Sequence, residues 1–299
     1  MAKKKLVIDL LPAIRKLEVL TKQHAESGLI GQYSSVFKGR GIEFEDYRTY
    51  STTDDASLID WKASKKANRI LIKEYVEERN VNVVFALDVS ESMLFGSTEK
   101  LKNEYAAELV ASLAHAILEV GDNVGLVMYN DTIVENIVPS RKKSQFYDIS
   151  RNLTNPELYG GNGKFSELSK FLLTSFNRGT VVIIVSDFVG MDEGWKSNLK
   201  IITSKFDVIG IIIRDPRDRT LPGDYVGEIL IKDPYSHKRV VIDPSLLKDL
   251  YEKETRRQEE ELLKSFVDAG ADSTIISTDE FFVKPIVKLF KLRALKIRR

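Results

Sequence analysis

The hydrophobic and polar positions follow two different periods along the second part of the chain. From residue 81 onward, short apolar runs rich in β-branched residues alternate with longer stretches whose apolar residues recur every three or four positions. The first pattern predicts strands and the second predicts helices. The predicted strands are Val81–Leu87, Asn123–Tyr129, Thr132–Val138, Thr180–Val185, Asp207–Ile213 and Thr274–Ile276, and the predicted helices are Glu99–Val120, Lys143–Leu153, Glu167–Phe176, Leu246–Ala269 and Asp279–Leu292. Strands that alternate with helices predict an α/β layer sandwich with a mainly parallel central sheet.

Two pairs of strands have connections that favour hairpins. The turn-prone pair Asn130-Asp131 separates Asn123–Tyr129 from Thr132–Val138. A later hairpin is predicted for Tyr225–Lys232 and Arg239–Val241.

The first 80 residues have a different pattern, which predicts a separate unit. One helix is expected around Leu11–Ala25. The sequence after Tyr33 is polar and irregular, with short segments and frequent aromatic residues. Partial alternation within Gly39–Arg48 and the run Ile70–Tyr75 predict two strands of a small domain. We therefore expect a helix and a small strand-rich domain over residues 1–80, followed by the α/β domain over residues 81–299.

Composition narrows the class of protein. The 299 residues are 43% hydrophobic and 30% charged with a net charge of +1, which is typical of a soluble globular protein and gives no overall attraction to nucleic acid or membranes. There is no cysteine, so disulfides and zinc–thiolate sites are excluded. No apolar stretch approaches the ~20 residues of a membrane span, and Asp9 and Pro12 interrupt the segment after the basic start, which argues against a signal peptide. The expected compartment is the cytoplasm.

The tail Lys284–Arg299 is the one candidate for nucleic-acid binding, with seven basic residues and no acidic one. Helix C-termini favour cations in any case. An apolar stripe also runs through this segment and predicts packing against the core, formed by Phe282, Ile286, Leu289 and Phe290. The sequence therefore favours an ordinary core-facing helix.

Candidate chemistry gathers where two predicted strands end. Asp88, Ser90 and Ser92 follow Val81–Leu87, and Asp187 follows another strand. Ligands bind beyond the carboxyl ends of strands in such sheets, so neighbouring parallel strands would bring the two carboxylates together. Carboxylate and hydroxyl oxygens suit Mg²⁺ or Mn²⁺. The alternative is that Asp88 and Asp187 only cap the segments that follow them.

These residues resemble a known kind of site. Asp-x-Ser-x-Ser after a first strand is similar to the metal-ion-dependent adhesion site of von Willebrand factor A domains. The chain as a whole resembles the family called domain of unknown function 58. The stretches that carry this resemblance are Gly39–Tyr50, Asp54-Asp55, Ile59–Ser64, Lys73–Arg79, Asp88–Met93 with Phe95-Gly96, Gly121–Leu126, Ser186-Asp187-Phe188, Asp215-Pro216-Arg217 with Leu221-Pro222, and Ser277-Thr278-Asp279.

The resemblance implies a von Willebrand factor A-like three-layer sandwich and a set of metal ligands. Such sites use the Asp and two Ser of the first loop, a Thr from a second loop and an Asp from a third. Asp88, Ser90, Ser92 and Asp187 match four of these places. Ser166 stands where the Thr belongs and keeps a hydroxyl there, although its alternative role is to cap its helix. The part of the family signature that precedes the α/β domain, Glu43–Tyr50 with Asp54–Lys62, departs from the family at Thr53 and Ser57. We interpret this part as structural.

Enzymatic readings fit the sequence less well. A haloacid dehalogenase-type phosphotransferase needs a second carboxylate two residues after Asp88 as general acid, and Ser90 stands there. A serine hydrolase needs a base and a Gly-x-Ser-x-Gly turn; the turn is missing, and the three histidines, His24, His115 and His237, lie in a helix or in polar text. A metal-dependent phosphoryl-transfer hydrolase with Asp88 as its key carboxylate is kept as the alternative.

The sequence therefore favours a binding protein over an enzyme. A Mg²⁺ ion held by carboxylates and hydroxyls keeps a place that an acidic side chain of another protein can fill. The resemblance also implies a partner, because relatives look like companions of MoxR-type AAA+ ATPases. The expected function is an adaptor that grips an acidic residue of such an ATPase or of its client protein during assembly or activation of a complex.

Overall fold

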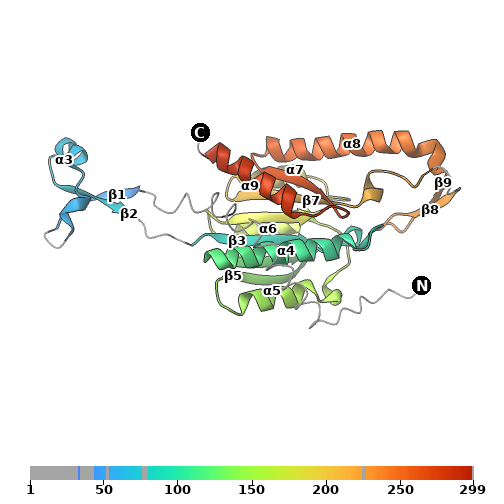
Figure 1. The fold of residues 1–299 in the computed structure, drawn as a ribbon, viewed down its shortest axis with the longest axis horizontal. Helices are drawn as coiled ribbons and strands as arrows, with labels where there is room; N and C mark the ends of the chain where they lie inside the picture. Colours follow the sequence, from blue (N-terminus) through green and yellow to red (C-terminus); the bar gives the residue numbers. More distant parts are fainter. Residues whose placement is uncertain (1–32, 34–43, 52–53, 76–79, 224–226, 298–299) are drawn as a thin grey trace.

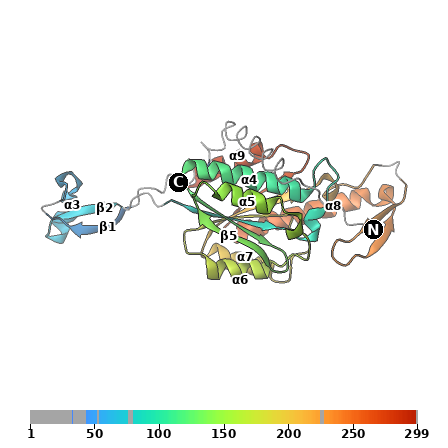
Figure 2. The ribbon, with the colours of Figure 1, turned by 90° about the horizontal axis from the view of Figure 1, so that it is seen from below.

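The computed structural model describes residues 33, 44–51, 54–75, 80–223 and 227–297. The helix expected at Leu11–Ala25 lies outside this part of the chain. Most of the described residues belong to one layered domain, shown from two sides in Figures 1 and 2.

A six-stranded sheet forms the centre of this domain. Its order is β10-β7-β6-β3-β4-β5, and every neighbouring pair is parallel except β4 with β5. The strands are β3 (Asn82–Asp88), β4 (Asn123–Tyr129), β5 (Ile133–Ser140), β6 (Val181–Ser186), β7 (Asp207–Arg214) and β10 (Asp272–Ser277). Residues of β3 and β6 are buried on both faces, as their continuous apolar runs require.

Helices cover both faces of the sheet and make the two outer layers. One face packs against α4 (Lys102–Val120), α5 (Gln145–Leu153) and α9 (Val283–Ile297), and the other against α6 (Phe165–Ser175), α7 (Trp195–Thr203) and α8 (Pro244–Asp268). Figure 2 shows α4 and α5 on the opposite side of the sheet from α6 and α7. The predicted class, a three-layer α/β sandwich with a mainly parallel sheet, is confirmed.

The stripe predicted on the last helix is also confirmed. Phe282, Ile286, Leu289 and Phe290 are all buried in the core on the α4 face. The basic residues of this segment therefore sit on a helix whose apolar side packs against the sheet. Among the described residues, no helix combines the length and the apolar character that a membrane crossing needs.

Two small antiparallel ribbons complete the described structure. Residues before the sheet form β1 (Phe44–Thr49), β2 (Leu71–Tyr75) and the short helix α3 (Trp61–Ala67). Asp60 caps α3 by accepting from the N–H groups of Lys62 and Ala63. The predicted late hairpin is present as β8 (Ile229–Lys232) and β9 (Arg239–Ile242), which pair with one another.

Candidate metal-binding site

The site is built where β3 and β6 end side by side. The two strands are parallel neighbours with Leu87 opposite Val185, so Asp88 and Asp187 leave the sheet at the same edge. Both carboxylates are fully buried. Each also accepts from the N–H group two residues further on, which is the capping contact expected as the alternative.

The first loop folds its hydroxyls toward both aspartates. The Ser90 N–H donates to Asp88 Oδ1 at 2.9 Å, and the Ser92 hydroxyl donates to Asp187 Oδ1 at 3.0 Å. The Ser90 and Ser92 hydroxyls are 3.3 Å apart. Four of the predicted ligands, Asp88, Ser90, Ser92 and Asp187, therefore form one connected, buried cluster.

The described contacts of Asp88 are with neutral donors and not with a cation. The Ser186 hydroxyl donates to Asp88 Oδ2 at 2.6 Å, and the Ser90 N–H satisfies the other oxygen. Burial, and secondly the nearby charge of Asp187, raise the pKa of Asp88 to about 6, although these hydrogen bonds oppose the shift. A buried carboxylate with a raised pKa is stabilised by any cation that comes close to it.

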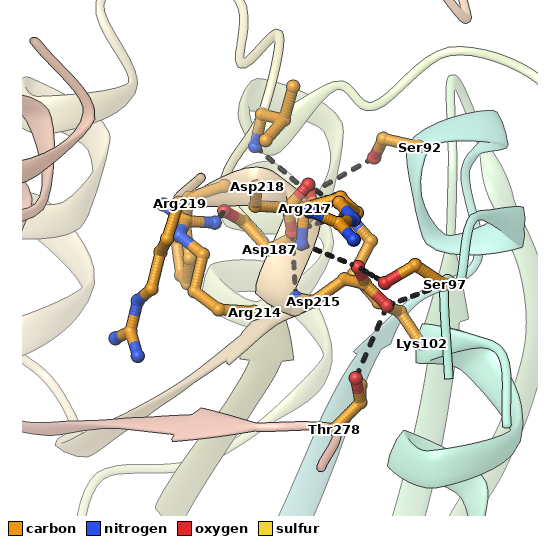
Figure 3. A network of polar contacts seen from close by, with 12 residues as sticks. Ser92, Ser97, Lys102, Asp187, Arg214, Asp215, Arg217, Asp218, Arg219 and Thr278 are labelled. Carbon is orange, nitrogen blue, oxygen red and sulfur yellow. Dashed lines mark hydrogen bonds and ion pairs between the residues drawn. The ribbon is translucent and has the colours of Figure 1, made fainter. Parts of the chain in front are cut away.

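Asp187 differs because a lysine side chain binds it. Lys102 Nζ, from the first turn of α4, lies 2.7 Å from Asp187 Oδ2 and 3.1 Å from Asp218 Oδ2. Arg214 donates to the main-chain carbonyl of Asp187. Figure 3 shows these side chains converging from α4, from the end of β6 and from the turn after β7.

The second loop, between α5 and α6, contacts the first loop, which follows β3. The contacts are made by the glycines of the second loop. The Gly160 N–H donates to the carbonyl of Val89 at 2.7 Å, and the Glu91 N–H donates to the carbonyl of Gly161 at 2.9 Å. A Cβ atom placed on Gly163 would lie 3.5 Å from Ser90 Oγ. The segment next to Ser90 is thus residues 160–163.

Ser166 lies further along, in the first turn of α6. Its N–H points toward Asp192, 3.3 Å from Oδ2, and the Phe165 N–H donates to Asp192 Oδ1 at 2.8 Å. Asp192 therefore caps the start of α6, the role that was the alternative for Ser166. Whether Ser166 joins the four clustered residues as a ligand stays a prediction.

A tyrosine from the β8–β9 hairpin also reaches the cluster. The Tyr235 hydroxyl lies 3.2 Å from Ser90 Oγ and donates to the carbonyl of Val189 at 3.0 Å. Its ring packs over Gly190, where a Cβ atom would come within 2.3 Å of Tyr235 Cε2. Neither Tyr235 nor Lys102 was predicted from sequence. The one available signal was the positive charge of Lys102 near the start of a helix, where a cation is unfavourable unless an anion lies close to it.

The residues present fit a hard divalent cation. They supply two carboxylates and two hydroxyls within one buried cluster, with Asp88 lacking a cation partner among its described contacts. No group of three or more His, Cys, Asp or Glu side chains suited to a metal occurs in the described part of the chain, so this site depends on serine hydroxyls. Zinc-type chemistry is not what this donor set favours.

Comparison with known proteins gives relatives of low sequence identity that this chain covers to different extents. A protein of Mycobacterium tuberculosis, described as "Uncharacterized protein Rv1480", is 24% identical over 288 residues, which cover 95% of this chain and 90% of the relative. YeaD of Bacillus subtilis is 24% identical over 128 residues, 43% of this chain and 29% of the relative.

Solved structures with detectable likeness include BatB from Bacteroides thetaiotaomicron, at 17% identity and a TM-score of 0.49, covering 72% of this chain and 100% of that one. A von Willebrand factor type A structure from Catenulispora acidiphila has 10% identity and a TM-score of 0.40, covering 73% of this chain and 43% of that one. The family described as "Protein of unknown function DUF58" matches residues 46–261. The chain belongs to this DUF58 family.

Proposed function

We propose that this protein is a non-enzymatic adaptor that binds other proteins through a Mg²⁺- or Mn²⁺-dependent adhesion site. The observation that supports it is the buried cluster of Asp88, Ser90, Ser92 and Asp187 at one sheet edge. A divalent ion held there would keep part of its coordination shell for water or for a ligand from outside. The ligand proposed is an acidic side chain of a partner.

The proposed partner is a MoxR-type AAA+ ATPase or its client, and the proposed compartment is the cytoplasm. The ATPase follows from the family resemblance, and the acidic contact follows from the charge of a bound divalent ion. Within the described part of the chain, neither histidine supports the enzymatic alternative, because the contacts of His115 and His237 run to Phe146 and Asp233 and not to Asp88 or Asp187.

Metal binding is tested by thermal unfolding. We expect Mg²⁺ or Mn²⁺ to raise the melting temperature of the full chain, since a ligand at 100 times its Kd stabilises the folded state by about 2.7 kcal/mol. Asp88→Ala should abolish this gain. Asp148→Ala, which removes a half-buried carboxylate in the first turn of α5, away from the cluster, should keep it. An unchanged melting curve at millimolar metal would count against the site.

Partner binding is tested by affinity capture from native extract. The tagged full chain should recover an AAA+ ATPase with Mg²⁺ present and lose it with a chelator. Asp88→Ala should fail to recover it under both conditions. Phosphatase activity that disappears in Asp88→Ala would instead support the hydrolase alternative and overturn the adaptor.

A further inference from the structure

Lys102 is a buried cation inside the candidate metal site. Its side chain is 2% exposed, and its ammonium group lies 2.7 Å from Asp187 Oδ2. Asp218, in the turn after β7, offers a second carboxylate at 3.1 Å. The N–H of Lys102 donates to the carbonyl of Phe95 at 2.9 Å, which fixes the start of α4 beside the loop that carries Ser90 and Ser92.

The two oxygens of Asp187 have different partners. Oδ1 accepts from the Ser92 hydroxyl and from the Val189 N–H, both at 3.0 Å. Oδ2 accepts from Lys102. The carboxylate thus presents one oxygen to the hydroxyl cluster while the other stays bound to a fixed positive charge (Figure 3).

Stability alone does not explain a lysine at this place. Desolvating two charges costs several kcal/mol, and buried ion pairs often add little net stability over apolar side chains of similar size. Here the lysine also compensates the charge of only one of the two aspartates. The described contacts of Asp88, which is equally buried, are hydroxyl and N–H donors without a cation. The cluster is therefore partly neutralised and keeps a negative charge for one more cation.

We propose that Lys102 is a positioning residue that sets the metal affinity of this site. Its ammonium holds Asp187 in place when no metal is bound and takes up part of the negative charge that would otherwise attract a divalent ion. The inference rests on the proposed function, because it assumes that the cluster takes Mg²⁺ or Mn²⁺. A fixed positive charge near a bound cation weakens binding through Coulomb repulsion, which is strong in a buried site.

The test is direct measurement of Mn²⁺ binding to the full chain by calorimetry. Lys102→Met should bind Mn²⁺ at least tenfold more tightly than the wild type, and its metal-free form should melt at a lower temperature. Lys102→Gln, whose amide can still donate to Asp187, should show the same tightening and guards against a variant that fails to fold. Lys102→Arg, which keeps the charge, should not tighten binding.

Lys100→Met is the matched control. Lys100 lies two residues earlier and pairs with Glu108, outside the cluster, so its removal should leave the Mn²⁺ affinity unchanged. Equal or weaker Mn²⁺ binding by both Lys102→Met and Lys102→Gln, with normal binding by the wild type, would overturn this inference and leave the proposed function standing. Absence of Mn²⁺ binding in the wild type and in all variants would overturn both.

Discussion

At the scale of single residues, three consecutive side chains interlock the two strand ends. Ser186 donates to Asp88 and accepts from the Phe188 N–H at 2.8 Å, while Asp187 turns the other way, to Ser92 and Lys102. Phe188 adopts a left-handed backbone conformation with φ of 53°. That conformation is strained for a side chain other than glycine. It is held by the ring of Phe188, which packs edge-on against Phe266 in the core.

Asp88 should make the metal-free protein sensitive to pH. Its pKa in the folded state, about 6, is above the ordinary value of 3.8, so the folded state binds the proton more tightly than the unfolded chain. This contribution to stability is fully present below pH 4 and is lost as the pH rises through about 6. In the presence of a chelator, Asp88→Asn should therefore stabilise the protein at pH 8, by on the order of 2–3 kcal/mol.

Denaturant unfolding at two pH values checks this effect. The stabilisation by Asp88→Asn should vanish near pH 4, where the wild-type carboxyl is already neutral. Adding Mg²⁺ at pH 8 should reverse the order of the two proteins, because the variant has lost a ligand. A variant that is less stable than the wild type at pH 8 without metal would show that the ionised Asp88 carboxylate does not destabilise the folded state.

The aspartates and serines of the site could be predicted because each follows a strand whose apolar run is unmistakable. Lys102 and Tyr235 could not, since their contacts join residues 85 and 145 positions apart in the chain. In the second loop the sequence indicates Ser166 by its hydroxyl, and its role as a ligand stays a prediction. The structure also lays Gly163 against Ser90, a contact that depends on backbone fit and not on residue chemistry.

At the scale of elements, the β8–β9 hairpin is attached to the site through its turn. Asp233 organises that turn by accepting from the N–H groups of Tyr235 and Ser236. The strands themselves expose apolar side chains, with Leu230 59% and Val240 58% exposed. The tyrosine contact with Ser90 and Val189 is therefore important for where the hairpin lies.

Gly190→Ala should release this hairpin. Its φ is +67°, and the new Cβ would meet the Tyr235 ring at 2.3 Å, so the ring has to leave its place. Hydrogen exchange and proteolysis at residues 233–238 should increase. Gly179→Ala is the control, because φ is +84° there but no atom lies within 4 Å of the added Cβ. Equal protection of the hairpin in the two variants would contradict the role given to Tyr235.

Most elements could be predicted because their patterns are long or fully apolar. The exceptions are short helices: α7 and α3 were not predicted, and α7 buries only Leu199 and Ile202 of its nine residues. The helix expected from Glu99 begins at Lys102 instead. The segment before it forms bends and not a helical turn, and it is tied to the sheet because Ser97 donates through both its N–H and its hydroxyl to Asp215, just after β7. Sequence periodicity cannot show a tertiary contact of this kind.

At the scale of the whole molecule, charged pairs fasten the last helix to the sheet. Arg293 on α9 binds Asp207 at 2.7 Å and Asp272 at 2.8 Å, at the starts of β7 and β10. The same helix supplies Phe290, which meets Tyr33 edge-on. The core of the α/β domain therefore includes a residue from the segment that the sequence assigned to residues 1–80.

Tyr33 should stabilise the sheet domain from outside its predicted boundary. Its ring is 1% exposed, and its hydroxyl donates to Asp122 Oδ2 at 2.8 Å. Tyr33→Phe should lower the free energy of unfolding by about 1 kcal/mol, a modest cost because Asp122 still accepts from the Val81 N–H. Tyr33→Ala should cost about 3–5 kcal/mol, since it also removes the buried ring.

Urea unfolding of the full chain measures both changes, with Tyr147→Phe as the control for losing an exposed tyrosine hydroxyl. If Tyr33 acts as an anchor, a fragment that begins at residue 80 should unfold at a lower urea concentration than the full chain, by about the deficit of Tyr33→Ala. A fragment as stable as the full chain would mean that the core closes without Tyr33. The boundary of the folding unit would then coincide with the start of β3.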